Sequence, residues 1–132
     1  MNYLTRTNDG IVISENSKIL NVNSSLKYTI NSLCKKNLST MNGRIDSVKT
    51  IFGFKSLIPI YIDNSTLLFP TASLRDYDIY FINYNEILFL VKKVDYLLIT
   101  FKDLSILKLY ISFTKMNKQM ERCKIINDYL NI

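Results

Sequence analysis

The chain contains no histidine and no tryptophan, and it has only three glycines, two prolines and two cysteines among its 132 residues. Histidine is the commonest general acid-base and the commonest metal ligand, so its absence removes most metalloenzymes and most Ser-His or Cys-His hydrolases. The glycines, Gly10, Gly43 and Gly53, do not form a phosphate-cradling loop of the GxGxxG or GxxxxGK type. We therefore expect a protein that is not an enzyme and that binds no metal or cofactor.

The two cysteines, the first ten residues and the lack of long apolar runs argue against an exported or membrane-inserted protein. Cys34 and Cys123 lie far apart, and residues 1–10 lack the basic start and apolar centre of a signal peptide. A disulfide or a zinc site is therefore not expected, and both thiols are predicted to be free, in the core or half-buried. No apolar run approaches the roughly 20 residues of a membrane-spanning helix, which predicts a cytoplasmic protein without a membrane partner.

The acidic residues offer little support for catalysis. Asp63, Asp76, Asp78 and Asp103 fall in predicted turns, where aspartate is preferred because its side chain bonds to nearby backbone. A catalytic carboxylate pair is therefore disfavoured. The weakest alternative that stays open is a nucleic-acid enzyme that uses Asp63, Asp76 or Asp78 with Mg²⁺.

The most distinctive stretch covers residues 58–83 and reads IPIYIDNSTLLFPTASLRDYDIYFIN. Its apolar runs predict three short strands, at residues 58–62, 67–69 and 79–82. Proline fixes φ and lacks an N–H, so Pro59 is expected to begin the first strand and Pro70 to end the second. The result is a rigid loop over residues 70–78, held between two strands.

Periodicity predicts strands and helices in the rest of the chain. A short helix is predicted over residues 43–52, and residues 26–34 fit either a helix or a bent strand, followed by a polar loop over 35–42. Further strands are predicted at residues 11–14, 18–22, 86–92, 96–101 and 105–112. An amphipathic helix over 114–130 has its apolar stripe at Met116, Met120, Cys123, Ile126 or Asn127, and Leu130.

These elements define the expected fold class. It is α+β, with an antiparallel sheet that is either open or curled towards a barrel, a short internal helix and an amphipathic C-terminal helix. At this length we expect a single domain over residues 1–132.

The net charge of +6 favours a polyanionic partner, and most of this charge lies in one segment. On the predicted 43–52 helix, Ile45 and Val48 share the apolar face, so Arg44 and Lys49 should point outward, towards solvent or a ligand. The segment is either a DNA-binding surface or a solvated basic face without a ligand. Against the single acidic Asp46, residues 23–55 hold Lys27, Lys35, Lys36, Arg44, Lys49 and Lys55.

Several residues together resemble the ComK family of competence transcription factors, which are DNA-binding activators of Gram-positive bacteria. The resemblance runs from about residue 30 to residue 87, and more loosely through the predicted strands at residues 96–101 and 105–112 and the terminal helix. Its most specific part is the Phe-Pro-Thr-x-Ser element that follows Pro-Ile. The matching positions are Ile30, Ser32, Cys34, Leu38-Ser39-Thr40, Gly43-Arg44, Lys49, Pro59-Ile60, Phe69-Pro70-Thr71, Ser73 and Phe81-Ile82.

The chain departs from the family pattern at three places. Phe81 stands where the family usually has tryptophan, and Asp78 where it often has cysteine. The sequence ends just after the predicted terminal helix, without a counterpart of the C-terminal tail that family members use for activation and for recognition by a proteolytic adaptor. We therefore expect DNA binding to be retained, and we leave open activation and contact with the transcription machinery or the adaptor.

The resemblance implies a nucleoid-associated bacterial regulator that binds paired AT-rich boxes of double-stranded DNA through the minor groove and forms a homo-oligomer there. Narrow AT-rich grooves concentrate negative potential and attract arginine and lysine, which agrees with the basic segment. The expected DNA-contacting residues are Lys27, Lys35, Lys36, Arg44, Lys49, Lys55, Thr71, Ser73 and Arg75.

Two questions stay open at this point. The loop after Pro70 either presents the hydroxyls of Thr71 and Ser73 to DNA, or it is a structural turn in which Phe69 is core and Thr71 caps backbone. The whole protein is either a DNA-binding regulator or a truncated interaction module that pairs with a regulator and modulates it. Phe81 is expected in the core.

Overall fold

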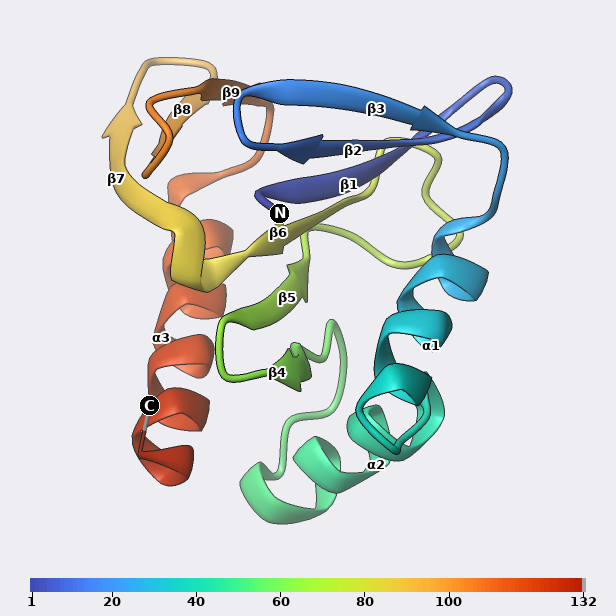
Figure 1. Cartoon of the computed structure of the whole chain (residues 1–132). Coiled ribbons are helices and arrows are strands. Elements are labelled where there is room, and N and C mark those ends of the chain that lie inside the picture. Colours follow the sequence, from blue (N-terminus) through green and yellow to red (C-terminus); the bar gives the residue numbers. More distant parts are fainter. Residues whose placement is uncertain (132) are drawn as a thin grey trace.

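The computed structural model describes residues 1–131, in which antiparallel strands dominate (Figure 1). Six strands form one sheet in the order β3-β2-β1-β6-β5-β4, and three form a second sheet in the order β7-β8-β9. The fold class is therefore α+β with open sheets, in agreement with the sequence prediction. The strands are β1 (Tyr3–Thr7), β2 (Gly10–Glu15), β3 (Lys18–Val22), β4 (Ile60–Asp63), β5 (Thr66–Pro70), β6 (Tyr80–Asn83), β7 (Ile87–Lys92), β8 (Leu97–Phe101) and β9 (Ile106–Leu109).

The described helices are α1 (Leu26–Lys36), α2 (Met41–Phe52) and α3 (Phe113–Leu130), and a 3-10 turn, η1 (Tyr84–Glu86), precedes β7. Each α-helix begins directly after Ser25, Thr40 or Ser112, whose hydroxyl accepts a hydrogen bond from a backbone N–H in the first turn. α2 ends at Gly53, which has the left-handed conformation that glycine adopts without strain. Within residues 1–131 no helix has the length and apolar character needed to cross a membrane.

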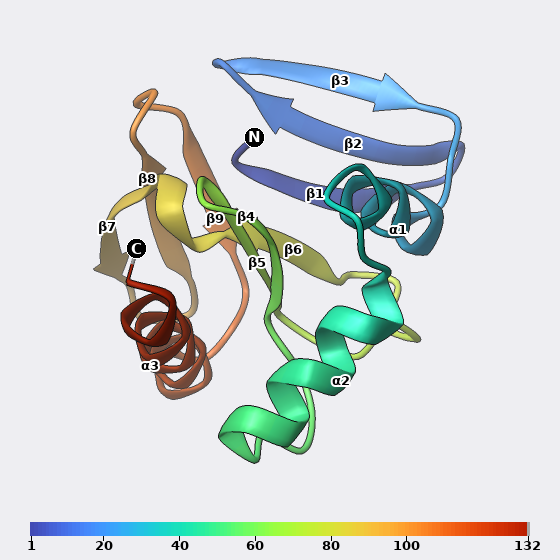
Figure 2. The ribbon, with the colours of Figure 1, turned by 60° about the horizontal axis from the view of Figure 1, so that its bottom comes forward.

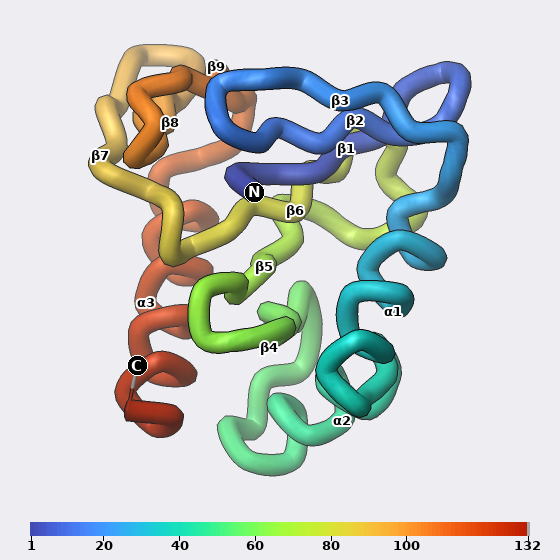
Figure 3. Tube along the Cα trace, in the orientation of Figure 1, coloured from blue at the N-terminus to red at the C-terminus, as the bar shows by residue number. Residues whose placement is uncertain are grey.

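The two faces of the six-stranded sheet are buried in two different cores, and α2 contributes to both, with Met41 in one and Val48 in the other (Figures 1 and 2). On one face, Leu68 and Phe81 are buried with residues of α1 and with Met41 of α2. On the other face, Phe69 and Ile82 are buried with residues of β8, β9 and α3. Because side chains alternate along a strand, β5 and β6 contribute to both cores. In the Cα trace, β5 accordingly runs between α3 and α1 (Figure 3).

Much of the predicted element pattern is confirmed. Residues 58–83 form β4, β5 and β6, and Pro70 is the last residue of β5. The strands predicted at residues 11–14 and 18–22 are β2 and β3, which pair as a hairpin, and the ambiguous segment at residues 26–34 lies in helix α1. Buried as predicted are Phe69, Phe81 and the free thiols of Cys34 and Cys123.

The polar loop predicted over residues 35–42 is wrong at both ends. α1 continues to Lys36, and α2 already begins at Met41 because Thr40 caps its first turn. Lys35 and Lys36 therefore lie on the last turn of a helix, where cations interact favourably with the helix dipole.

The predicted buried stripe of the terminal helix also needs correction. Met120 is only half-buried and Leu130 is exposed, whereas Gln119 is buried; Met116, Cys123 and both alternatives, Ile126 and Asn127, are buried as predicted. The physical reason is that both amides find partners inside: Gln119 donates to backbone carbonyls, and Asn127 donates to Asn85. The hydrogen bonds of the two amide nitrogens lower the cost of burial, although Gln119 Oε1 and Asn127 Oδ1 are buried without a partner among residues 1–131. Polarity alone therefore misplaces Gln119 on the face of α3.

Candidate nucleic-acid interface

The lysines of the basic segment are exposed to solvent and can contact an anion. Lys27, Lys35, Lys36, Lys49 and Lys55 are all exposed, on α1, on α2 and just after α2. Among residues 1–131, the ion pairs join the N-terminal ammonium of Met1 to Glu15 and Lys124 to Asp128. The basic side chains of residues 23–55 are therefore not neutralised by any ion pair in the described part of the chain.

A hollow of about 260 Å³ lies where α2 meets two loops. Lys49 comes from α2, Lys55 from the loop after α2, and Ser73 from the loop after Pro70. Both charged residues of the wall are lysines, and the rest of the wall is largely apolar. The structure thus brings together side chains from the basic segment and from the distinctive 58–83 stretch, which the sequence pattern could not place side by side.

Helix α3 holds both loops of this hollow. The Nε2 of Gln119 donates hydrogen bonds to the carbonyls of Leu57 and Pro70, both at 2.8 Å. Arg122 donates to the carbonyl of Ser56 at 2.7 Å, and its guanidinium lies 4.6 Å from the ring centroid of Phe54. The positions of Lys55 and Ser73 therefore depend on helix α3, whose Gln119 is 62 and 49 residues away from its two carbonyl partners in the sequence.

Sequence reasoning missed Gln119 and Arg122. The signal that could have found Gln119 is its position between Met116 and Cys123, on the apolar side of the predicted helix. A polar residue there is buried only if it finds a hydrogen-bond partner, so it points to a loop whose carbonyls need a donor. Arg122 carries no comparable local signal.

Arg44 lies on the other flank of α2. Its guanidinium carbon is 4.9 Å from the ring centroid of Tyr61, and its Nε is buried without a hydrogen-bond partner among residues 1–131. Together with Asn37 and Asp63 it lines a second, polar hollow of about 420 Å³. The prediction that two outward cations share the helix is therefore right for Lys49, whereas Arg44 is half-buried against an aromatic ring. Asn37 directly follows Lys36, so the end of α1 borders this second hollow.

The loop after Pro70 answers one of the open questions for Thr71. Its side chain is 6% exposed, its hydroxyl accepts the N–H of Tyr80 at 2.9 Å, and its own N–H donates to the carbonyl of Tyr80. Thr71 thus has the structural role, extending the β5–β6 pairing by one step. Ser73 and Arg75 are exposed on the same loop, which Arg6 fastens through the carbonyls of Leu74 and Asp76.

The carboxylates and thiols serve the fold. The side chains of Asp63, Asp76 and Asp103 each accept the backbone N–H two residues later, at 3.0 Å, which confirms their predicted role in turns. Burial raises the pKa of the thiols of Cys34 and Cys123, so neither is a reactive thiolate. Within residues 1–131 no cluster of three His, Cys, Asp or Glu side chains has a metal-binding arrangement.

Comparison with known proteins gives one finding. The family model described as ComK protein matches residues 4–131, nearly the whole chain. Neither a curated protein nor a solved structure gave a significant match. The match spans both sheets and all three described helices, including the basic segment and the loop after Pro70. The chain belongs to the ComK family.

Proposed function

We propose that this ComK-family protein is a transcription regulator of competence that binds AT-rich duplex DNA through the minor groove. The observation that carries the proposal is the family match over residues 4–131. We place the primary contact at Lys49, Lys55 and Ser73, with Lys35, Lys36, Lys27 and Arg75 as outer contacts. Self-association on DNA, activation and location at the nucleoid in the bacterial cytoplasm are parts of the same proposal.

The arrangement of charge supports this contact surface. Lys49 and Lys55 are exposed at one hollow, have no ion pair, and are joined there by a hydroxyl that can donate to a phosphate oxygen. AT-rich minor grooves are narrow and carry enhanced negative potential, which favours inserted lysine and arginine. We leave Thr71 out of the proposed contact, because its hydroxyl is buried and already hydrogen-bonded.

Salt-dependent binding tests the surface. On an AT-rich duplex, Lys49→Ala/Lys55→Ala should bind more weakly, and the slope of log K against log salt should become shallower by about 2, since each lost phosphate contact removes about 0.9. A charge-matched control is Lys93→Ala/Lys102→Ala, which removes two exposed lysines outside residues 23–55 that form no ion pair among residues 1–131. Equal slopes for the two double variants would reject the assignment of Lys49 and Lys55.

A second pair of lysines tests how far the interface extends. Lys35→Ala/Lys36→Ala changes the end of α1, which borders the hollow beside Arg44. If these lysines are outer phosphate contacts, affinity should fall less than in the Lys49/Lys55 variant, and equally for all duplex sequences. A larger loss than for Lys49 and Lys55 would move the primary contact to the Arg44 flank.

Base substitution tests the groove. Replacing A·T pairs of a bound duplex by inosine·cytosine keeps the minor-groove pattern of A·T but changes the major-groove pattern. We expect binding to be retained with inosine·cytosine and to fall with guanine·cytosine, whose extra amino group lies in the minor groove. Loss of binding with inosine·cytosine would contradict minor-groove recognition while leaving the salt experiment unaffected.

A further inference from the structure

Strand β3 is an open edge of the six-stranded sheet, and it carries apolar side chains. All five of its residues are exposed, including Ile19 at 54%, Leu20 at 45% and Val22 at 37%. In Figures 1 and 2 no other element lies beyond it. Exposed apolar edge strands are templates for pairing with another strand, and proteins usually protect them.

The other sheet edges show such protection. At the opposite end of the same sheet, the pairing of β4 has a register shift between Tyr61 and Asp63, and α2 packs against this strand. In the second sheet, β7 has a register shift between Ile87 and Phe89, and β9 carries Lys108 within the strand, whereas Lys18, the lysine of β3, is the first residue of its strand, beside the turn. The β2–β3 register, by contrast, runs without a break over the whole strand, and β3 contains no proline.

The turn of the hairpin fixes which backbone groups of β3 are free. β2 and β3 are joined by the two residues Asn16 and Ser17, both with positive φ, so Glu15 and Lys18 form the hydrogen-bonded pair that closes the turn. Such pairs alternate along the ladder, so Leu20 bonds to β2, whereas Ile19 and Asn21 direct their N–H and C=O outward. No turn, loop or side-chain hydrogen bond described for residues 1–131 uses these outward groups.

A row of apolar side chains crosses the sheet, and its last member, on β3, is exposed to solvent. Phe81, Leu4, Ile13 and Leu20 are paired in sequence across β6, β1, β2 and β3, and therefore lie on one face. Leu4 is fully buried and Phe81 is 2% exposed, but exposure rises to 45% at Leu20. A second sheet with the same row, joined at Leu20, would continue it symmetrically.

Charge favours a second copy of this chain over a charged partner. In a two-fold interface the same patch faces itself, so a charged patch repels its own copy. Residues 1–22 are balanced, with Arg6 and Lys18 against Asp9 and Glu15, although the whole chain carries +6. On β3 itself Lys18 is the only charged residue, and it lies at the turn end of the strand. Pairing two copies about the middle of β3 therefore keeps the two ammonium groups apart, where salt screens their repulsion.

We propose that a second copy of this chain pairs with β3 in antiparallel orientation, with the two-fold axis at Leu20. Ile19 of each copy exchanges both backbone hydrogen bonds with Asn21 of the other, and the two Leu20 side chains meet as the close, non-hydrogen-bonded pair. The two Lys18 residues then lie four strand positions apart, about 14 Å at a rise of about 3.4 Å per residue. The two six-stranded sheets become one continuous sheet.

Proline at an outward position tests the pairing without breaking the hairpin. Ile19→Pro removes an N–H that points away from β2, so the β2–β3 ladder keeps its hydrogen bonds. By sedimentation over about a hundredfold range of protein concentration, the wild type should be a dimer and Ile19→Pro should weaken dimerisation at least about tenfold. The matched control is Ile19→Thr, which keeps the N–H and the branched β-carbon and should still dimerise.

A second variant covers the case in which Ile19→Pro does not fold. Leu20→Lys places two ammonium groups directly opposite each other at the two-fold axis, and it should give a monomer, most clearly at low salt. The proposal is overturned if the wild type is a monomer over the whole range, if Ile19→Pro dimerises as well as the wild type, or if β3 instead captures an extended segment of another protein.

This inference gives an interface to the self-association that is part of the proposed function, and the β3 interface and DNA binding can fail separately. Ile19→Pro should bind a duplex with one AT-rich box as tightly as the wild type, because Lys49 and Lys55 are not altered. It should lose the cooperative binding of two boxes. A dimer that binds no duplex would contradict the proposed function alone, and a DNA-binding monomer would contradict the β3 interface alone.

Discussion

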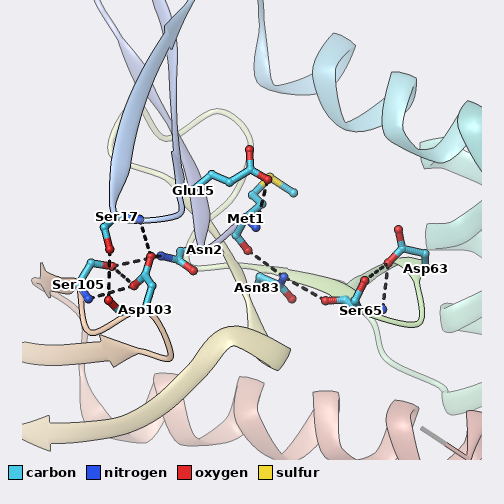
Figure 4. A network of polar contacts seen from close by, with 9 residues as sticks. All are labelled: Met1, Asn2, Glu15, Ser17, Asp63, Ser65, Asn83, Asp103 and Ser105. Atoms are coloured by element: carbon cyan, nitrogen blue, oxygen red, sulfur yellow. Dashed lines mark hydrogen bonds and ion pairs between the residues drawn. The ribbon is translucent and has the colours of Figure 1, made fainter.

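Asp103 shows how one side chain can connect three parts of this chain. Its carboxylate accepts hydrogen bonds from the side chain of Asn2, from the backbone N–H of Ser17 in the β2–β3 turn, and from the N–H and hydroxyl of Ser105 (Figure 4). These bonds, led by that of the Ser105 hydroxyl, hold the pKa of Asp103 well below its usual range. The ionised form of Asp103 therefore fastens the β8–β9 turn to the six-stranded sheet.

Asp103→Asn should remove this fastening and its pH dependence. At neutral pH we expect a loss of at most about 1 kcal/mol in the free energy of unfolding, because charge-assisted hydrogen bonds become neutral ones while solvent screens this partly exposed carboxylate. A folded-state pKa below the unfolded value of about 3.9 means that the contribution is complete above this value and is lost as pH falls further. Urea unfolding at several pH values should therefore show the wild type and variant converging below about pH 4. If the difference in free energy of unfolding between the wild type and the variant stayed constant with pH, the proposed role of the Asp103 charge would be contradicted.

We expect Arg44 to contribute more to folding stability than to DNA binding. Its guanidinium packs on Tyr61 and its Nε is buried, so Arg44→Ala should cost about 1 kcal/mol of stability through lost cation–π contact and packing. On the same helix, exposed Lys49→Ala should change stability by less than about 0.5 kcal/mol. Thermal unfolding of both variants checks this. Equal stability of the two would show that the Tyr61 contact contributes nothing.

At the scale of elements, the sequence was most informative where local chemistry and packing agree. The β4–β5–β6 unit was predictable because its turns and Pro70 stop the apolar runs. β1 was not predicted, since Leu4 is the one aliphatic residue in Tyr3–Thr7, and the strand is specified by its pairing with β2 and β6 on both sides. Pairing partners remote in sequence leave little local trace.

The sequence identifies most residues of the candidate site but does not show that they lie close together. Charge counting finds Lys49 and Lys55, and the loop after Pro70 is visible from its turn residues. That these groups share a hollow depends on Gln119, whose two carbonyl partners lie 62 and 49 residues away. The burial of Arg44 depends similarly on Tyr61 in β4, so neither its half-buried position nor its distance from Lys49 follows from helix periodicity alone.

Gln119→Leu tests α3 as the element that positions the DNA-contacting loops. The substitution keeps the approximate shape of the side chain but removes this donor from the carbonyl of Pro70 and leaves the carbonyl of Leu57 only the longer, 3.5 Å bond from Arg122. Because it also removes the unpartnered Oε1, stability should fall by about 1 kcal/mol. If the duplex is bound as proposed, affinity should also fall, while the salt slope stays that of the wild type because no cation is removed. Binding titrations at several salt concentrations distinguish the two effects. A shallower slope would mean that phosphate contacts were lost as well.

At the scale of the molecule, the two cores share their central strands. Leu68 and Phe81 face the core under α1 and α2, while Phe69 and Ile82, their neighbours in β5 and β6, face the core under α3 and the three-stranded sheet. Neither core can lose its β5–β6 wall without exposing the other. We therefore expect residues 1–132 to unfold as one cooperative domain.

The two cysteines provide a built-in test of this cooperativity. Cys34 lies in the core with α1 and α2, Cys123 in the core with α3, and burial raises the pKa of both thiols, so each should react only after its own core opens. In pulsed thiol labelling along a denaturant series, with each cysteine followed by mass spectrometry, both should become reactive at the same midpoint and with the same slope. A shared β5–β6 wall does not allow one core to open alone. If Cys34 were labelled at a lower denaturant concentration than Cys123, this expectation would be wrong, and the core with α1 and α2 would unfold as a separate unit.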